Sequence, residues 1–270
     1  MPHYIDAHSH LADSRLDLTR DDVMERARAR GIEFHIQGGV GPEDWDQQVE
    51  ISESYPGQIF PVFGLHPWWV VQHDQQVCES ALGFLRNYLK SGVGLGELGL
   101  DYGPKIPSGS HALQKMIFEY QLKMAREFAL PIILHVVHAH DDALAMLTQF
   151  GVPKGGIVHS FSETTEIAQR YLALGLTLSI SGSVITRDSG KAFEKLKRTV
   201  LALGLDQIVI ETDSPDQPPA GVSGHGAVLN EPANLWSVAE AVGRLKQVSA
   251  EVVLEASKKN LVRIFGLGVS

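Results

Sequence analysis

Residues 5–11 of the chain read Ile5-Asp6-Ala7-His8-Ser9-His10-Leu11, an apolar start followed by two histidines one residue apart. In a β-strand, residues two apart point to the same face, so His8 and His10 can bind one metal ion from a strand end. The same spacing also occurs between ordinary polar histidines. The remainder of the chain favours a metal site, because it repeats a pattern in which a short apolar run is followed by a residue of a metal-binding type.

Short apolar runs rich in Val, Ile and Leu recur eight times and alternate with amphipathic segments. Continuous apolar runs of this length are typical of parallel strands that are buried on both faces. We expect strands at residues 4–8, 34–37, 60–64, 93–96, 131–135, 156–159, 177–181 and 207–211. We expect helices at about residues 20–30, 42–54, 77–90, 110–128, 140–150, 163–174, 189–203, 233–247 and 250–265.

Eight short strands, each followed by a helix, predict a (β/α)8 TIM barrel, distorted and with an extra C-terminal helix. We expect one domain covering residues 1–270, since barrels of this length are commonly a single domain. A doubly wound open sheet is the alternative fold. It would require a glycine-rich phosphate loop after the first strand, where His8-Ser9-His10 stands instead. At the first helix, Thr19 and Asp22 resemble a capping box.

The composition is that of an ordinary soluble globular protein, with 44% hydrophobic and 20% charged residues among 270. We recognise neither an apolar run of about 18 residues nor a secretory signal, so we expect no membrane span and no export. A single cysteine, Cys78, excludes an intrachain disulfide and fits a reducing cytoplasm. The net charge of −9 disfavours a broad basic face, so any nucleic-acid contact is expected to be local. The oligomeric state stays open, and a monomer is compatible with the sequence.

Six residues of metal-ligand type stand at or just after the expected strands. They are His8, His10, Glu97, His135, His159 and Asp213. In a closed barrel these strand ends converge on the face where active sites of this fold lie. Six ligands exceed the needs of one tetrahedral ion and suit two divalent ions about 3.5–4 Å apart. Glu97 is the natural bridging ligand, as the acidic ligand from the middle of the chain.

The charge of such a site favours an anionic substrate. Two divalent ions carry about four positive charges, and two carboxylates with a bridging hydroxide remove three, which suits a phosphodiester. Imidazole-rich ligation favours Zn, Mn, Fe or Ni over Mg, and Zn, Mn and Mg remain the candidates. Asp6 and Glu211 are expected to accept hydrogen bonds from the histidine ligands, and Asp101 to organise the loop after Glu97.

Several other residues near the strand ends are candidates for contacts with a substrate. His66 ends the third expected strand and is expected to hydrogen-bond a phosphate or a leaving group. Trp68 and Trp69 could form a stacking platform for a base, or one of them could pack against a helix. The further candidates are His138, Arg187 and His225.

At these residues the chain resembles the TatD family of metal-dependent deoxyribonucleases, in the amidohydrolase superfamily. The matching motifs span nearly the whole chain: Asp6-Ala7-His8-Ser9-His10, Gly64-Leu65-His66-Pro67, Gly96-Glu97-Leu98-Gly99-Leu100-Asp101, Gln114, Gln121, Leu130-Pro131, His135, His159-Ser160-Phe161-Ser162, Glu211-Thr212-Asp213-Ser214-Pro215, Asn230-Glu231-Pro232 and Asn260 near Phe265-Gly266. The resemblance implies a hydrolase that removes nucleotides from DNA ends. It also implies one ion on His8, His10, Glu97 and Asp213, and a second ion on Glu97, His135 and His159.

The expected function is therefore that of a binuclear metal-dependent hydrolase, a phosphodiesterase or deoxyribonuclease acting on single-stranded DNA ends or a small anionic ester. A metal-bridging hydroxide would attack phosphorus, and Asp213 would orient it and accept its proton. One alternative is an amidohydrolase-type enzyme for another ester, a lactone or a cyclic amide. A second alternative is a metal-binding barrel without catalytic activity.

Two departures from the family pattern concern the substrate. The Ser-Arg pair that usually follows the histidine at position 135 is replaced by Val136-Val137. The usual Tyr-Arg-Gly-Lys run is replaced by residues 222–229, which contain neither Arg nor Lys. Both missing arginines could bind a phosphate group of DNA, so their loss predicts only weak activity on DNA. The residues of metal-ligand type are all present, so the metal chemistry is expected to be intact. His138, His140 and His225 could partly take over this role.

Overall fold

The computed structural model of the chain describes residues 3–152, 154–221 and 229–269. Its eight strands form one sheet in sequence order, with every neighbouring pair parallel. The strands are β1 (Tyr4–Ser9), β2 (Ile32–Gln37), β3 (Ile59–Phe63), β4 (Gly94–Asp101), β5 (Ile132–Val137), β6 (Gly156–Val158), β7 (Leu176–Ile180) and β8 (Ile208–Ile210). A bridge between Ser9 and Ser214 joins the two edges, so the sheet is nearly closed.

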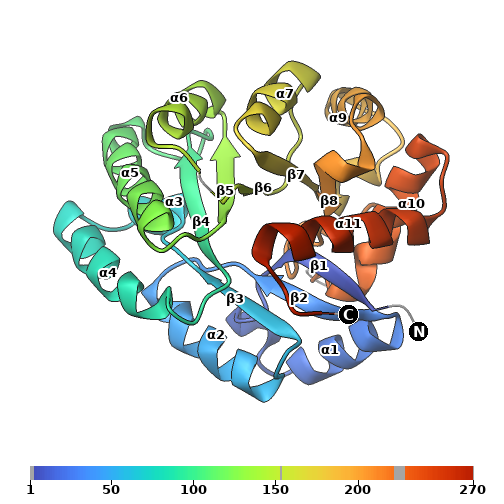
Figure 1. Ribbon diagram of the computed structural model, residues 1–270, viewed down its shortest axis with the longest axis horizontal. Coiled ribbons are helices and arrows are strands. Elements are labelled where there is room, and N and C mark those ends of the chain that lie inside the picture. The colour runs from blue at the N-terminus through green and yellow to red at the C-terminus, as the bar shows by residue number, and fades with distance from the viewer. Residues whose placement is uncertain (1–2, 153, 222–228, 270) are drawn as a thin grey trace.

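Helices surround this sheet on the outside (Figure 1). The α-helices are α1 (Arg20–Ala29), α2 (Pro42–Ser54), α3 (Pro67–Val71), α4 (Gln75–Tyr88), α5 (His111–Glu127), α6 (His140–Phe150), α7 (Thr165–Ala173), α8 (Gly182–Ile185), α9 (Lys191–Ala202), α10 (Leu235–Lys246) and α11 (Ala250–Phe265). Short 3-10 turns are η1 (Ser14–Leu16), η2 (Ser108–Ser110), η3 (Leu205–Gln207) and η4 (Pro232–Asn234). The predicted (β/α)8 barrel with an extra C-terminal helix is thereby confirmed.

The last helix, α11, lies across the end of the barrel where the strands begin (Figure 1). Its residues Leu261 and Phe265 pack in one buried cluster with the barrel interior, which includes Ile5, Ile36 and Val209. Side chains that point into the barrel alternate along each strand with side chains that point outward. The inward apolar side chains of this cluster fill the half of the barrel nearest the amino ends of the strands. The opposite end, where the strands terminate, is left for polar side chains. Among the described residues, none of the helices has the length and apolar character needed to span a membrane.

Local details differ from the expectations at three places. The fourth strand was expected to end before Glu97, whereas β4 continues to Asp101 and contains it. Thr19 precedes α1 without a side-chain capping bond, so the predicted capping box is wrong; its hydroxyl donates to the Leu16 carbonyl instead. The short helices α3 and α8 were not predicted, because a helix of four or five residues is too brief to show a periodic pattern.

Candidate active site

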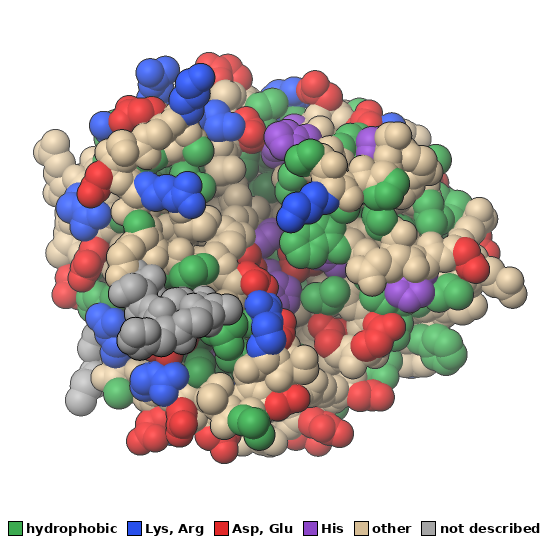
Figure 2. Space-filling model, turned by 180° about the vertical axis from the view of Figure 1, so that it is seen from behind, with side chains coloured by type: hydrophobic (Ala, Val, Ile, Leu, Met, Phe, Trp, Pro, Cys, Tyr) green, Lys and Arg blue, Asp and Glu red, His purple; other side chains and the backbone are tan. Residues whose placement is uncertain are grey.

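The six residues of metal-ligand type converge at the carboxyl end of the barrel. Figure 2 shows histidine side chains inside a hollow on this face, the one opposite α11. His8 comes from β1, His135 from β5, and His159 directly follows β6. Parallel strands of a barrel point their carboxyl ends the same way, so residues distant in sequence meet there. Three groups formed by these side chains and His66 have ligand atoms within 4.8 Å of one another: His8, His159 and Asp213; His8, His10 and Glu97; and His66, Glu97 and His135.

Glu97 reaches this end through an irregularity inside β4. The pairing of β4 with β5 shifts register between Gly96 and Leu98, which is how a bulge re-aims a side chain. Gly96 has φ +156°, and a Cβ there would collide with the backbone of Ile133 on the neighbouring strand. Glycine is therefore required beside Glu97 for the two strands to approach so closely.

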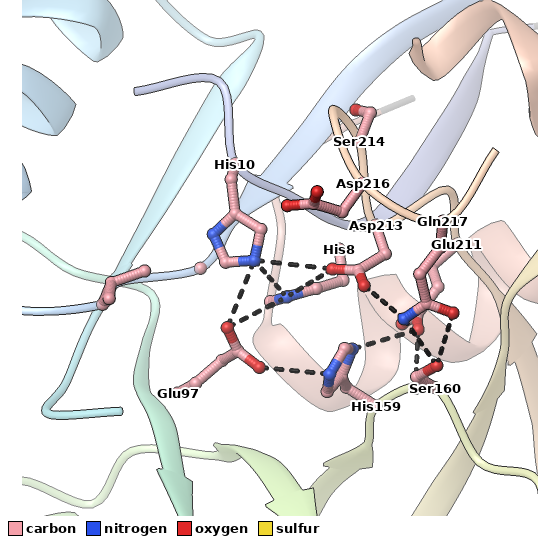
Figure 3. A network of polar contacts seen from close by, with 12 residues as sticks. His8, His10, Glu97, His159, Ser160, Glu211, Asp213, Ser214, Asp216 and Gln217 are labelled. Atoms are coloured by element: carbon pink, nitrogen blue, oxygen red, sulfur yellow. Dashed lines mark hydrogen bonds and ion pairs between the residues drawn. The ribbon is translucent and has the colours of Figure 1, made fainter. Parts of the chain in front are cut away.

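The Glu97 carboxylate lies between two pairs of histidines, and Figure 3 shows it with His8 and His10 on one side and His159 on the other. Its Oε1 is 3.4 Å from His8 Nε2 and 3.2 Å from His10 Nε2. Its Oε2 is 3.2 Å from His159 Nε2 and 3.6 Å from His135 Nδ1. Each oxygen thus faces its own pair of ring nitrogens, which is the arrangement a carboxylate has when it serves two neighbouring cation sites.

Asp213 adds a second carboxylate on the side of His8 and His10. Its Oδ1 lies 3.5 Å from His8 Nε2 and 3.4 Å from His10 Nε2. Burial would raise the pKa of Asp213, but His159, His10 and His8 outweigh burial and lower that pKa to about 2. The pKa of Glu97 is likewise held well below its usual range, because nearby imidazoles outweigh its burial. Both carboxylates are therefore ionised at neutral pH.

The chemistry of this cluster fits divalent metal ions. Glu97 is 1% exposed, and its Oε2, although 3.2 Å from His159 Nε2, makes no hydrogen bond of suitable geometry among the described residues. A buried carboxylate oxygen without a donor is costly unless a cation satisfies it. Imidazole nitrogens together with carboxylate oxygens are the donors that zinc and neighbouring transition metals prefer.

Glu211 and Asp6 differ in how they support the cluster. Glu211 Oε1 lies 3.2 Å from His159 Nδ1, which leaves Nε2 of that ring free to face Glu97. Asp6, expected to do the same, forms no hydrogen bond with a histidine ring in the part of the chain that the structure describes. Its carboxylate accepts from the backbone N–H and, at 2.5 Å, the hydroxyl of Thr212, and so fixes the segment that leads to Asp213.

His66 has a defined tautomer. It is the N-cap of α3, and its Nδ1 accepts a hydrogen bond from Trp68 N–H at 2.9 Å. Burial lowers the pKa of His66 well below its usual value, so the ring is neutral. A neutral ring with an accepting Nδ1 carries its proton on Nε2. That Nε2 lies 3.1 Å from His135 Nδ1, so His66 presents an N–H donor beside the metal-type ligands.

The two adjacent tryptophans have different environments. Trp69 is 7% exposed, donates to Glu43 at 2.7 Å and stacks on His73, so it is the packed member of the pair. Trp68 is 53% exposed, and its Nε1–H donates to Asp101 Oδ2 at 2.5 Å. The same Asp101 oxygen lies 3.3 Å from His135 Nε2. The Asp101 carboxylate therefore fixes the orientation of both the Trp68 indole and the His135 ring.

Two lobes of the cleft meet at the cluster. The larger, lobe 1, has a volume of about 610 Å³, and the smaller, lobe 2, has about 470 Å³. Both are lined by His10, His66, Trp68, Glu97 and Asp216. A substrate whose reacting group lies at the cluster could therefore extend to either side.

The remaining candidate contacts are distributed unevenly. His138 and His140 line lobe 1, as does Val137, which stands where the resemblance expects arginine. Arg187 is exposed after α8 and is not among the residues that line either lobe. His225 lies outside the described residues.

Sequence reasoning missed two polar residues in the cleft, Arg15 and Gln217. Arg15 is the one arginine or lysine among the described residues that line the lobes. Its guanidinium is held by the carboxylates of Asp13 and Asp216 at 2.7–2.9 Å. Gln217 is hydrogen-bonded to Asp213. Neither belongs to a motif with a known spacing, so nothing in the sequence distinguished them from surface residues.

Gly38→Ala is expected to weaken metal binding. Gly38 follows β2, and a Cβ there would overlap the ring of His8. The displaced imidazole should lower the affinity for Zn²⁺ by on the order of 10- to 100-fold, as changes around metal ligands commonly do. Competition with a chromophoric chelator measures this. Gly83→Ala in α4, where a Cβ meets nothing within 4 Å, is the matched control, and equal affinities in both variants would contradict the prediction.

Comparison with known proteins agrees with this geometry. A profile of the TatD related DNase family matches residues 5–266. The chain is 30% identical over 264 residues to YabD of Bacillus subtilis strain 168, an uncharacterized metal-dependent hydrolase, covering 96% of this chain and 98% of YabD. It is 27% identical over 269 residues to the deoxyribonuclease TATDN3 of Homo sapiens, covering 97% and 94%.

A solved structure shows the same likeness in three dimensions. The crystal structure of YJJV, a TatD homologue of Escherichia coli K12, superposes with a TM-score of 0.87 at 26% identity, covering 97% of this chain and 98% of that one. The match of the family profile extends over nearly the whole chain and includes every residue of the cluster. The protein is thus a metal-dependent hydrolase of the TatD related DNase family.

Proposed function

We propose that the protein hydrolyses phosphodiester bonds at two divalent metal ions, acting on single-stranded DNA ends or small phosphodiesters. The observation that carries this proposal is the Glu97 carboxylate, whose two oxygens face separate pairs of histidines. His8, His10, Glu97 and Asp213 would hold one ion, and Glu97, His135 and His159 the other. The deoxyribonuclease name of the human relative supports the choice of substrate class.

Asp213 and His66 are suited to different roles in the proposed hydrolysis. Divalent ions, when bound, acidify a water and polarise the phosphoryl group. Asp213 is ionised and faces the cluster through Oδ1, so it can orient the attacking water and accept its proton. His66 is neutral and presents its Nε2–H to the same space, so it can donate to a phosphoryl oxygen or to the leaving group.

Trp68 is suited to hold a base at the junction of the two lobes. More than half of the Trp68 surface is exposed, so the face of the ring is accessible to a substrate. The hydrogen bond from its Nε1–H to Asp101 fixes the orientation of the ring. A rigid aromatic face favours stacking of any base, at about 1–3 kcal/mol per base. This arrangement supports recognition of a nucleotide without sequence preference.

The charge of the cleft supports a short substrate over a long duplex. Arg15 alone supplies a positive side chain among the described lining residues, and two carboxylates already neutralise it. A protein that neutralises few phosphates has a shallow salt dependence of binding. We therefore infer weak deoxyribonuclease activity, with short single strands and small phosphodiesters preferred over duplex DNA.

Val137→Arg is expected to raise nuclease activity. Val137 lines lobe 1, at the position where the family pattern supplies an arginine. An arginine–phosphate contact is a charge-assisted bond of roughly 1.5–3 kcal/mol, which corresponds to about one to two orders of magnitude in kcat/KM. Cleavage of a labelled single-stranded oligonucleotide measures it, with Val252→Arg on the exposed side of α11, at the opposite end of the barrel, as the control. A gain that is absent, or equal in both variants, would show that position 137 does not contact the substrate.

A substrate screen tests the proposed function as a whole. The protein is assayed with Mn²⁺, Zn²⁺ and Mg²⁺ against bis(p-nitrophenyl) phosphate, single- and double-stranded DNA, lactones and cyclic amides. Turnover of the phosphodiesters and of single strands is expected. Turnover of lactones or cyclic amides alone would replace the proposal with the amidohydrolase alternative. Complete inactivity of protein with bound metal would favour a non-catalytic barrel.

A further inference from the structure

Gln217 lies beside the Asp213 carboxylate because the intervening chain turns back on itself. Asp213 and Gln217 both adopt left-handed backbone conformations, with φ +56° and +50°. The N–H of Asp216 donates to the Asp213 carbonyl at 2.9 Å, which closes the turn. The Asn230 side chain donates to the backbone carbonyls of Thr212 and Gln217 and holds both ends. The Gln217 amide is thereby directed at a residue of the metal-type cluster (Figure 3).

The two oxygens of Asp213 have different partners. Oδ1 faces the ring nitrogens of His8 and His10 at 3.5 and 3.4 Å. Oδ2 accepts a hydrogen bond from Gln217 Nε2. A carboxylate held in this way offers one oxygen to the cation side, while the other oxygen is occupied by a neutral donor.

Three serine hydroxyls fix the orientation of the Gln217 amide. Its Oε1 accepts from Ser160 at 3.0 Å, Ser181 at 3.0 Å and Ser183 at 2.5 Å. These serines come from the segments that follow β6 and β7, on neighbouring parts of the barrel rim. A reversed amide would lose all three donors and place its oxygen against the Asp213 carboxylate. Only the orientation with Nε2 toward Asp213 satisfies every group.

Ser160 extends the network to the other side of the cluster. Its hydroxyl accepts from Gln217 Nε2 at 2.9 Å, and its backbone N–H donates to Glu211 Oε1 at 2.6 Å. The same Glu211 oxygen lies 3.2 Å from His159 Nδ1. A continuous chain of hydrogen bonds therefore runs from Asp213 through Gln217, Ser160 and Glu211 to His159.

We propose that Gln217 is a positioning residue, which holds Asp213 as a single-oxygen ligand and couples its geometry to that of His159 through Ser160. The inference rests on the proposed function only in taking Asp213 and His159 as metal ligands. Without the donor, the Asp213 carboxylate loses its fixed orientation, so Oδ1 is no longer held toward the cation side. That change would weaken the bond to the cation and misplace the group that has to orient the attacking water.

Gln217→Met tests this role, since methionine keeps the length of the side chain and removes the donor. Manganese binding is measured by electron paramagnetic resonance with Mn²⁺ alone, which needs no substrate. We expect a 10- to 100-fold loss of affinity for one ion, the range typical of residues that orient metal ligands. In a phosphodiesterase assay, kcat should fall by a similar factor while KM changes less than about threefold. Gln75→Met on the exposed face of α4 is the matched control.

A double-mutant cycle with Ser160→Ala tests the coupling through Ser160. This variant loses the hydroxyl but keeps the backbone N–H that donates to Glu211. Residues in one hydrogen-bond network show non-additive effects, so the double variant should lose less Mn²⁺ affinity than the product of the single losses. Additive losses would overturn the link to Ser160.

Other outcomes of these experiments separate positioning from general stability. Wild-type Mn²⁺ affinity and kcat in Gln217→Met would overturn the proposal, whatever the melting temperature of the metal-free protein. If Gln217→Met fails to fold, Ser183→Ala replaces it, because this variant removes one of the hydroxyls that hold the Gln217 amide. Ser183→Ala is expected to show a smaller loss of Mn²⁺ affinity. Unchanged Mn²⁺ affinity in Ser183→Ala would overturn the proposal. The wild-type protein could bind Mn²⁺ and still be inactive on phosphodiesters. That result would contradict the proposed function but not the role of Gln217 in metal binding.

Discussion

Asp213→Asn is expected to lower kcat on bis(p-nitrophenyl) phosphate by on the order of 10²- to 10⁴-fold, the usual contribution of a positioned general base. Asparagine keeps the shape of the side chain but cannot accept a proton. It also conflicts with Gln217, because its amide nitrogen must face either the Gln217 donor or the cation side. The pKa of Asp213 is lowered to about 2, so the wild-type residue is ionised throughout the neutral range and the loss should not be restored at pH 9.

The control for this variant is Asp141→Asn on α6, where the carboxylate is exposed and pairs with Arg170. The metal content of both proteins is measured beside their kinetics, so that lost turnover can be separated from lost ions. A kcat for Asp213→Asn within a few-fold of the wild type would remove Asp213 from the role of base.

Glu97→Ala should have the largest effect on metal binding. Glu97 is the one described residue whose carboxylate oxygens lie within 3.6 Å of both histidine pairs. Its removal would take one ligand from each of the two proposed ions and leave two groups of imidazoles close together with less negative charge between them. Bound metal should fall from two ions to one or fewer per chain, with affinity reduced by more than about 100-fold and turnover lost in proportion.

Metal analysis by mass spectrometry after gel filtration measures this effect. Glu119→Ala on α5 is the matched control, since that carboxylate forms only an exposed pair with Lys123. Two ions retained per chain in Glu97→Ala would contradict the bridging role. Retention of a single ion with low activity would agree with it.

The barrel and the convergence of residues of metal-ligand type were predictable for one physical reason. Parallel strands buried on both faces require continuous apolar runs, so the eight strands are visible in the sequence. Once a barrel is inferred, the residue that follows each strand is placed on a common face by topology alone. His8, His135 and His159 could therefore be grouped without any knowledge of their contacts.

Details that depend on packing between distant segments could not be predicted. The bulge that carries Glu97 inside β4 depends on the close fit of Gly96 against Ile133 on β5, and no local pattern encodes that fit. Which tryptophan faces the cleft depends on whether Asp101 or Glu43 receives the indole N–H. Such choices are made by tertiary neighbours, which periodicity does not reveal.

The supporting carboxylates illustrate the same limit. Glu211 directly follows β8 and Asp6 lies within β1, and both were expected to accept from a histidine ring. Glu211 does so at His159, whereas the approach of β1 to the segment after β8 places Asp6 against the Thr212 backbone and hydroxyl. Gln217 could not be foreseen either, because its contact with Asp213 depends on a turn in which two non-glycine residues have positive φ.

The presence and position of two ions is the central claim, and anomalous diffraction from crystals of the Zn²⁺- or Mn²⁺-loaded protein tests it most directly. Two strong anomalous peaks per chain are expected, about 3.5–4 Å apart on either side of the Glu97 carboxylate. One should lie among His8, His10 and Asp213, and the other between His135 and His159. A single peak, or peaks away from Glu97, would contradict the account.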